Sequence, residues 1–136
     1  MGGVVAALAL GAQAVQIGTA FLGCAESGAP SVHREILFQP EARDTQLTRV
    51  FSGRLVRAIR NRFMDDMTKH AADLPPYPIQ NWFSGSLRKA AIEQGKADFL
   101  SLQAGQGAGL LKERTAQALM DKLVRETSAA LNAISR

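Results

Sequence analysis

The sequence is poor in the residues that build disulfide frameworks and metal centres. It has one cysteine, Cys24, which excludes an intrachain disulfide and a cysteine-rich zinc site. It has two histidines, His33 and His70, and we expect no metal site from so few ligands. Lysine and arginine are also absent before Glu26, which excludes the positively charged start of a secretory signal peptide.

Length and composition indicate one folded domain. The chain has 136 residues, of which 46% are apolar and 21% are charged. These proportions are close to those of ordinary globular proteins and argue against disorder. The net charge of +4 is basic enough to keep a nucleic-acid partner open, although it does not establish one.

The uncharged beginning of the chain has two interpretations. Residues Gly3 to Leu22 are long enough to span a bilayer, so a small membrane-anchored protein is one alternative. Gln13, Gln16 and Thr19 interrupt this run, and a buried helix followed by a buried strand explains it better. We therefore expect no membrane partner and a cytoplasmic location.

Hydrophobic periodicity and turn residues predict an α/β protein. The apolar stripe Leu55, Ile59, Phe63 and Met67 predicts an amphipathic helix, and Thr115 is expected to cap the last helix. Gly11 is expected to end the first helix with a positive φ angle, and Gly95 to end a later one. The expected helices are 4–10, 31–38 (capped by Ser31), 54–70, 87–94 and 115–134, with strands at 14–19 and 46–51 and a loop at 71–78.

A glycine turn at the end of the expected 14–19 strand is a candidate phosphate site. Gly18 allows close approach to the backbone, and free N–H groups before a helix attract anions. The hydroxyl of Thr19 adds one further donor. The motif is short, and a turn that only requires glycine is the alternative explanation.

A second glycine-rich stretch, residues 104–111, contains Gly105, Gly107 and Gly109. It lacks the preceding apolar strand and the acidic residue about 20 positions later that a dinucleotide site requires. We therefore interpret it as a turn.

Five arginines fall between residues 49 and 62, and a basic module that binds nucleic acid through them is a further alternative. Acidic residues lie close by in the sequence, and no aromatic residues are interleaved for base stacking. Local ion pairs on a solvated helix face are the preferred interpretation, and we expect no nucleic-acid partner. The arginines are Arg49, Arg54, Arg57, Arg60 and Arg62.

No arrangement of nucleophile and base stands out in the sequence. Nothing places Cys24 beside a histidine, and neither His33 nor His70 lies in a recognisable catalytic pattern. We expect no catalytic residue in this chain.

Several pieces of the sequence resemble the C-terminal portion of nitronate monooxygenases, formerly called 2-nitropropane dioxygenases. They follow the order of that family and extend over nearly the whole chain. The pieces are residues 5–22, Glu26-Ser27-Gly28-Ala29 with His33-Arg34, Thr48-Arg49-Val50-Phe51-Ser52-Gly53-Arg54, Arg57-Ala58-Ile59-Arg60-Asn61, Pro76-Tyr77-Pro78 and Ala104-Gly105-Gln106.

The resemblance implies an FMN-dependent oxidoreductase that uses O2 to oxidise alkyl nitronates. It implies FMN binding by Gln16, Ile17, Gly18 and Thr19, in agreement with the phosphate turn, and it places Gln106 near the barrel mouth as a further FMN-binding residue. The catalytic histidine of the family, which lies in a Gly-Gly-His segment, has no counterpart in this sequence.

The implied fold is a partial (β/α)8 TIM barrel, with only the later strands and helices and a helical C-terminal region. A complete barrel needs about 250 residues. Residues 1–136 are therefore expected to form a single C-terminal fragment of an FMN-binding barrel domain. Such a fragment has free sheet edges, and we expect it to be marginally stable, to self-associate or to need an N-terminal half.

Overall fold

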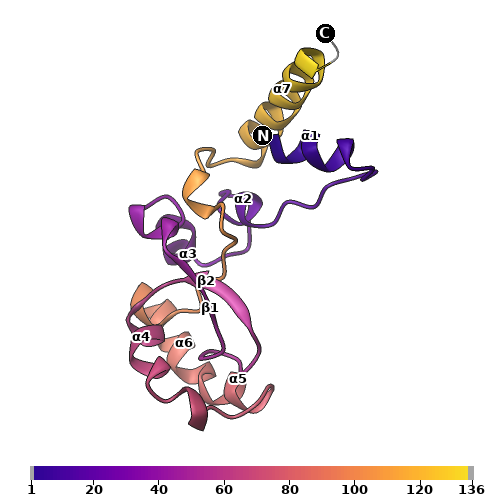
Figure 1. The fold of residues 1–136 in the computed structure, drawn as a ribbon. Coiled ribbons are helices and arrows are strands. Elements are labelled where there is room, and N and C mark those ends of the chain that lie inside the picture. The colour runs from indigo at the N-terminus through magenta and orange to yellow at the C-terminus, as the bar shows by residue number, and fades with distance from the viewer. Residues whose placement is uncertain (1, 135–136) are drawn as a thin grey trace.

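The computed structural model describes residues 2–134, which form short helices and one β-hairpin (Figure 1). Short 3-10 turns lie at Pro40–Arg43, Ala71–Asp73, Ala97–Phe99 and Ala108–Leu110. The helices are α1 (Gly2–Ala9), α2 (Thr19–Leu22), α3 (Ser31–Ile36), α4 (Arg62–Thr68), α5 (Ile79–Phe83), α6 (Gly85–Glu93) and α7 (Ala116–Ile134), and the strands are β1 (Thr45–Thr48) and β2 (Val56–Ile59).

The two strands pair antiparallel, with Thr45 opposite Ile59 and Thr48 opposite Val56. Gly53 turns the connecting loop with a φ of +80°. A Cβ atom at this glycine would lie 2.5 Å from the backbone nitrogen of Tyr77, so both the conformation and the space require glycine.

A third extended segment, residues 102–104, lies beside β2. The N–H of Ile59 donates to the carbonyl of Leu102 (2.9 Å), and the N–H of Ala104 donates to the carbonyl of Arg57 (3.2 Å). These bonds anchor the segment that leads directly into the Gly105–Gln106 motif.

Two clusters of apolar side chains form the core on either side of the hairpin. One joins the hairpin to α3, α6 and the segment around residue 102, and the other lies under the 50–51 loop and α4. The first contains Leu37, Ala42, Ile59, Ala91, Leu100, Leu102, Ala104 and Ala108. The second contains Val50, Phe51, Ala58 and Met64.

The elements near the chain ends lie apart from this core. Figure 1 shows α1 beside α7 at one end of the molecule, whereas α4, α5 and α6 surround the hairpin at the other end. Among residues 2–134, no helix combines the length and the apolar character that crossing a bilayer requires.

The prediction of one helix over residues 54–70 is wrong. Residues 56–59 form β2 instead, and α4 begins only at Arg62. Asn61 separates the two elements, since its side chain accepts a hydrogen bond from the N–H of Met64 and starts a new helix. The four-residue spacing of the apolar stripe therefore combines a strand residue, Ile59, with helix residues, while Leu55 is 53% exposed.

The strand expected over residues 14–19 is also not formed, because no neighbouring strand pairs with it. Residues 14–18 are irregular, and Thr19 starts α2. The described residues contain one two-stranded antiparallel sheet rather than the succession of parallel strands expected of a barrel. The second expected strand is shifted, since β1 covers residues 45–48 rather than 46–51.

Several helix boundaries are confirmed. Gly11 has the expected positive φ angle, Gly95 follows the end of α6 as expected, and the hydroxyl of Thr115 accepts from the N–H of Ala118 at 3.2 Å. The expected Ser31 cap is wrong, because Ser31 is already helical and Pro30 precedes it without a side-chain hydrogen bond.

The last helix, α7, buries only some of its apolar side chains. Leu119 is 5% exposed, whereas Val124 is 61% and Ile134 is 72% exposed. α7 packs on α1 and α2.

Asn61 connects three parts of the fold through one buried side chain. Its Nδ2 donates to the carbonyls of Ala97 (3.0 Å) and Leu100 (2.8 Å), while its Oδ1 caps α4. We expect Asn61→Ala to lower the free energy of unfolding by about 2–4 kcal/mol, because a cap and two buried acceptors lose their partner. Urea unfolding followed by circular dichroism measures the change.

Asn61→Asp provides the matched control for that substitution. It keeps the capping oxygen but replaces both donors with an acceptor that faces two carbonyls. We expect it to be destabilised as well. Equal stability of Asn61→Asp and the unmodified chain would contradict a role for the two donated hydrogen bonds.

His33 ties α3 to the segment beside β2. Its Nε2 lies 3.2 Å from the carbonyl oxygen of Gln103, so this nitrogen carries the proton and donates. Burial lowers the pKa of His33 from its ordinary 6.5, although the hydrogen bond to Gln103 partly opposes this effect.

Because the folded chain holds His33 neutral, the unfolded chain binds a proton more readily. We expect the free energy of unfolding to be highest above about pH 6.5 and to fall as the pH drops toward the lowered pKa of the folded state. His33→Gln, which can still donate to Gln103, should reduce this dependence. Unfolding curves between pH 5 and about 7.5 test the prediction. An unaltered pH profile for His33→Gln would contradict it.

Candidate functional site

The glycine turn at residues 18–19 and the glycine-rich stretch that begins at residue 104 meet in the fold. The hydroxyl oxygen of Thr19 accepts a hydrogen bond of 2.9 Å from the backbone N–H of Gly105. The pairing of residues 102–104 with β2 delivers Gly105 to this position, and the start of α2 delivers Thr19. Two motifs separated by 86 positions thus form one surface corner.

This corner has properties that suit an anion. The hydroxyl of Thr19 accepts from Gly105 and keeps its own proton free to donate. In the part of the chain that the structure describes, the backbone N–H groups of Gly18 and Thr19 have no acceptor. No atom lies within 4 Å of the position of a Cβ at Gly18, so the backbone there is open to approach.

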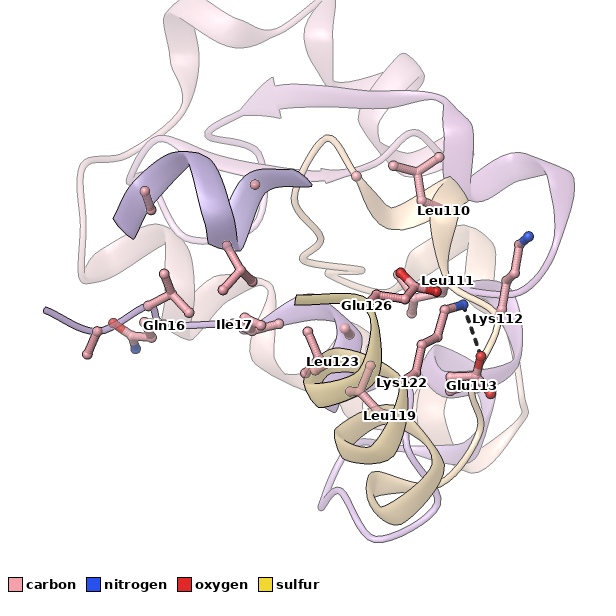
Figure 2. Close-up of a pocket in the computed structure, with 17 residues that line it drawn as sticks. Gln16, Ile17, Leu110, Leu111, Lys112, Glu113, Leu119, Lys122, Leu123 and Glu126 are labelled. Carbon is pink, nitrogen blue, oxygen red and sulfur yellow. Dashed lines mark hydrogen bonds and ion pairs between the residues drawn. The ribbon is translucent and has the colours of Figure 1, made fainter. Parts of the chain in front are cut away.

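The other expected cofactor residues lie around this corner in different settings. Gln16 and Ile17 line a cavity of about 770 Å³ between α1, α7 and residues 107–113 (Figure 2). Gln106 directly follows Gly105 and is exposed. The structure therefore joins Thr19 to the Gly105–Gln106 stretch and directs Gln16 and Ile17 toward a separate, mostly apolar cavity.

Sequence reasoning missed two polar features beside these residues. The first is Gly105 itself, whose N–H fixes the hydroxyl of Thr19. The second is an ion pair of 3.0 Å between Lys122 and Glu113 at the edge of the cavity. No spacing in the sequence indicates either contact, because each joins segments that only the tertiary fold brings together.

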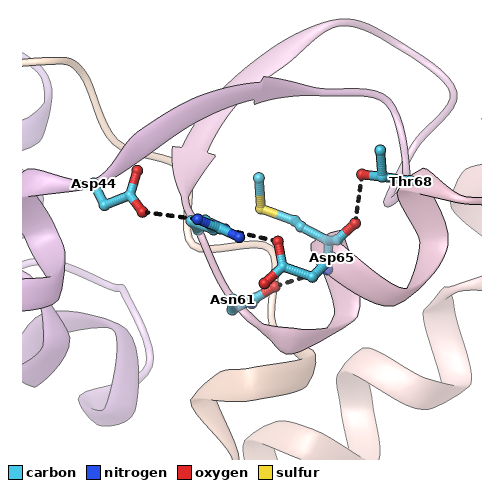
Figure 3. Close-up of polar contacts among 6 residues, drawn as sticks. Asp44, Asn61, Asp65 and Thr68 are labelled. Atoms are coloured by element: carbon cyan, nitrogen blue, oxygen red, sulfur yellow. Dashed lines mark hydrogen bonds and ion pairs between the residues drawn. The ribbon is translucent and has the colours of Figure 1, made fainter.

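The arginines between residues 49 and 62 are spread over a loop, β2 and α4 rather than one helix face. Arg60 forms ion pairs with Asp65 at 2.7 Å and with Asp44 at 3.7 Å (Figure 3). Arg62 forms a separate ion pair with Asp66 at 3.3 Å. The hydrogen bond to Asp65 raises the pKa of the Arg60 guanidinium. The expected local ion pairs are formed, whereas the expected single helix face is wrong, and the arrangement gives no support to a nucleic-acid interface.

The remaining candidate reactive groups are held in structural contacts. Cys24 is buried, its thiol lies 3.4 Å from the carbonyl of Ala20, and burial together with the charge of Glu26 raises its pKa. His33 is bonded to the backbone, and His70 is exposed. Across residues 2–134, no three His, Cys, Asp or Glu side chains gather where they could hold a metal ion.

Comparison with known proteins gives consistent relatives. Residues 1–126 match the family described as nitronate monooxygenase. A protein named probable nitronate monooxygenase from Staphylococcus aureus (strain Newman) is 38% identical over 124 residues, which cover 91% of this chain and 35% of that protein. A protein of the same name from Staphylococcus saprophyticus is 38% identical over 130 residues, 96% of this chain and 37% of that protein.

Solved structures share the fold. Nitroalkane oxidase from Streptomyces ansochromogenes superposes with a TM-score of 0.90 and 41% identity, over 98% of this chain and 38% of its own. FabK from Thermotoga maritima superposes with a TM-score of 0.78 and 27% identity, over 98% of this chain and 42% of its own.

This chain therefore spans a little over a third of the length of the curated relatives it matches. The family match covers far more than half of the chain, and identity above 35% extends over nearly all of it. The order of the motifs and the shared backbone lead to the same assignment: the chain belongs to the nitronate monooxygenase family.

Proposed function

We propose that this chain supplies the phosphate-binding part of an FMN-dependent oxidoreductase that acts on alkyl nitronates with O2. The observation that carries the proposal is the hydrogen bond between Thr19 and Gly105, because it assembles an open, donor-rich corner from two separate glycine motifs. Family membership supports the activity, and the corner supports a role for these residues in holding an anionic group.

The FMN phosphate fits the donors at this corner. The N–H groups of Gly18 and Thr19 and the Thr19 hydroxyl proton are the groups that would hold it. Gln106 follows Gly105 at the exposed rim and would contact another part of the cofactor. Gln16 and Ile17 directly precede the turn at Gly18, and we propose that they bind FMN through their backbone groups.

Bound FMN would supply the redox chemistry that transfers electrons from the nitronate to O2. The contribution of this chain is to bind and orient the cofactor, and we assign no catalytic residue to it. His33 is unsuitable as a base toward substrate, because it is buried and its Nε2 is committed to the carbonyl of Gln103.

The fold assigned with this function is the later portion of a (β/α)8 barrel. The shared backbone with the Streptomyces nitroalkane oxidase over 98% of the chain supports it. Under this proposal residues 1–136 form one fragment of an FMN-binding domain, and the complete site requires polypeptide that the longer relatives contain. A cytoplasmic location is part of the same proposal.

Substitution of Thr19 tests the phosphate site. In a complex of this chain with the portion of the Staphylococcus aureus relative outside the match, Thr19→Val should raise the Kd for FMN roughly 10- to 100-fold, because a hydrogen bond to a charged group contributes about 1.5–3 kcal/mol. Thr19→Ser keeps the hydroxyl and is expected to bind almost normally. Quenching of flavin fluorescence gives both constants.

Riboflavin separates a phosphate contact from general damage, because it lacks the phosphate. Thr19→Val should weaken FMN binding and leave riboflavin binding within about twofold of its original strength, given the precision of fluorescence titration. An equal loss for both flavins would contradict the assignment of Thr19 to the phosphate. Absence of FMN binding by the unsubstituted complex would contradict the proposed function.

The same complex tests the activity. We expect oxygen consumption with an alkyl nitronate that depends on added FMN, measured with an oxygen electrode. His70→Gln should leave the rate unchanged, because no catalytic role is assigned to this exposed histidine. A complex that binds FMN but consumes no oxygen with any alkyl nitronate would contradict the substrate class.

A further inference from the structure

His33 is a buried histidine to which the proposed function gives no role. Its side chain is 8% exposed, and it belongs to α3. Burial of a polar ring costs free energy unless the ring is hydrogen-bonded. The bond that compensates this cost joins its Nε2 to the carbonyl oxygen of Gln103, at 3.2 Å. Gln103 lies two positions before Gly105, so the contact connects a core side chain to the candidate site.

The carbonyl of Gln103 points away from the hairpin. Gln103 lies opposite Ala58 in an antiparallel bridge, and the two hydrogen bonds of that bridge come from its neighbours Leu102 and Ala104. In such a pair, the N–H and carbonyl groups of the two opposed residues are directed outward, away from each other. Among residues 2–134, no backbone N–H donates to the carbonyl of Gln103, and His33 donates to it instead.

One peptide group is therefore held at both of its ends. The carbonyl of Gln103 and the N–H of Ala104 belong to the same planar unit. His33 donates to the carbonyl, and the N–H donates to the carbonyl of Arg57 at 3.2 Å. Without the bond from His33 this plane keeps one anchor only, and it is free to rotate about that anchor.

The orientation of this peptide determines the direction of the next N–H. Only the φ and ψ angles of Ala104, which is 6% exposed, separate it from the peptide that carries the N–H of Gly105. That N–H donates to the hydroxyl of Thr19 at 2.9 Å, on the exposed side of the molecule. Water competes for an exposed hydrogen bond, so the contact depends on how firmly its partners are held.

We propose that His33 is a positioning residue for the corner formed by Thr19 and Gly105. By fixing the peptide between residues 103 and 104, it keeps the N–H of Gly105 on the Thr19 hydroxyl and the hydroxyl proton directed at a bound anion. The inference deepens the proposed function and rests on it for the identity of that anion, the FMN phosphate. A purely structural role predicts instead that loss of His33 lowers the stability of the fold with no specific effect at this corner.

Amide hydrogen exchange in the full chain, measured by NMR, tests the first step. His33→Leu has a similar volume but no donor, and we expect the Gly105 amide to exchange about tenfold faster. The Asp65 amide, which donates to the carbonyl of Asn61 in another part of the fold, is the reference for overall stability. Unchanged exchange at Gly105 relative to this reference would overturn the proposal.

Two amide variants provide the matched control for that experiment. His33→Gln keeps a donor that reaches Gln103, and it should preserve the original exchange at Gly105. His33→Asn is shorter by one CH2 group, so its donor stops short of the carbonyl and it should behave like His33→Leu. This pair gives the same comparison if the leucine variant does not fold. Equal exchange at Gly105 in the two amide variants would contradict a role for the donated bond.

The complex used for Thr19 tests the effect on the cofactor. We expect His33→Leu to raise the Kd for FMN about fivefold and to leave riboflavin binding within about twofold, because only FMN carries the phosphate. His33→Gln should bind FMN almost normally. An equal loss of affinity for both flavins would indicate general damage and count against the positioning role.

A double substitution identifies the route of the effect. Because His33 acts through the Thr19 hydroxyl, His33→Leu should cause no further loss of FMN affinity in a chain that already carries Thr19→Val. A further loss of about fivefold would show that the two residues act independently, and the proposal would then be wrong. A complex that binds no FMN contradicts the proposed function, whereas exchange at Gly105 in the chain alone still decides the role of His33.

Discussion

The backbone pairing of residues 102–104 with β2 is the constraint on which the candidate site depends. Two hydrogen bonds, from Ile59 to Leu102 and from Ala104 to Arg57, anchor this segment against the hairpin. Gly105 is the next residue, and its N–H therefore has a fixed position from which it bonds the hydroxyl of Thr19. The core beneath, with Leu102 and Ala104 fully or almost fully buried, makes that position rigid.

The two halves of the molecule differ in how completely their polar backbone is satisfied. Around the hairpin, buried side chains such as Asn61, Gln80 and Ser84 donate to loop carbonyls, and no buried side-chain N or O atom in the described chain lacks a partner. Around residues 14–17 the backbone has no partners, and apolar walls surround an unfilled cavity. Among the described residues, the first region pairs its buried polar side chains, whereas the second leaves backbone groups unpaired beside an apolar cavity.

The comparison with longer relatives bears on this difference between the two halves of the molecule. The relatives are two to three times as long, and the shared backbone extends over 98% of this chain. The candidate phosphate turn lies immediately after residues 14–17, so the position of Gly18 and Thr19 depends on the path of that stretch.

The sequence by itself determined the family, the end of the first helix at Gly11 and the Thr115 cap. These depend on local conformational preferences or on ordered motifs, which a single chain segment carries. Only the tertiary structure decided that residues 56–59 are a strand, that residues 14–19 are not, and that Thr19 meets Gly105. A strand exists only where a partner supplies its hydrogen bonds, and the identity of that partner is a property of distant residues.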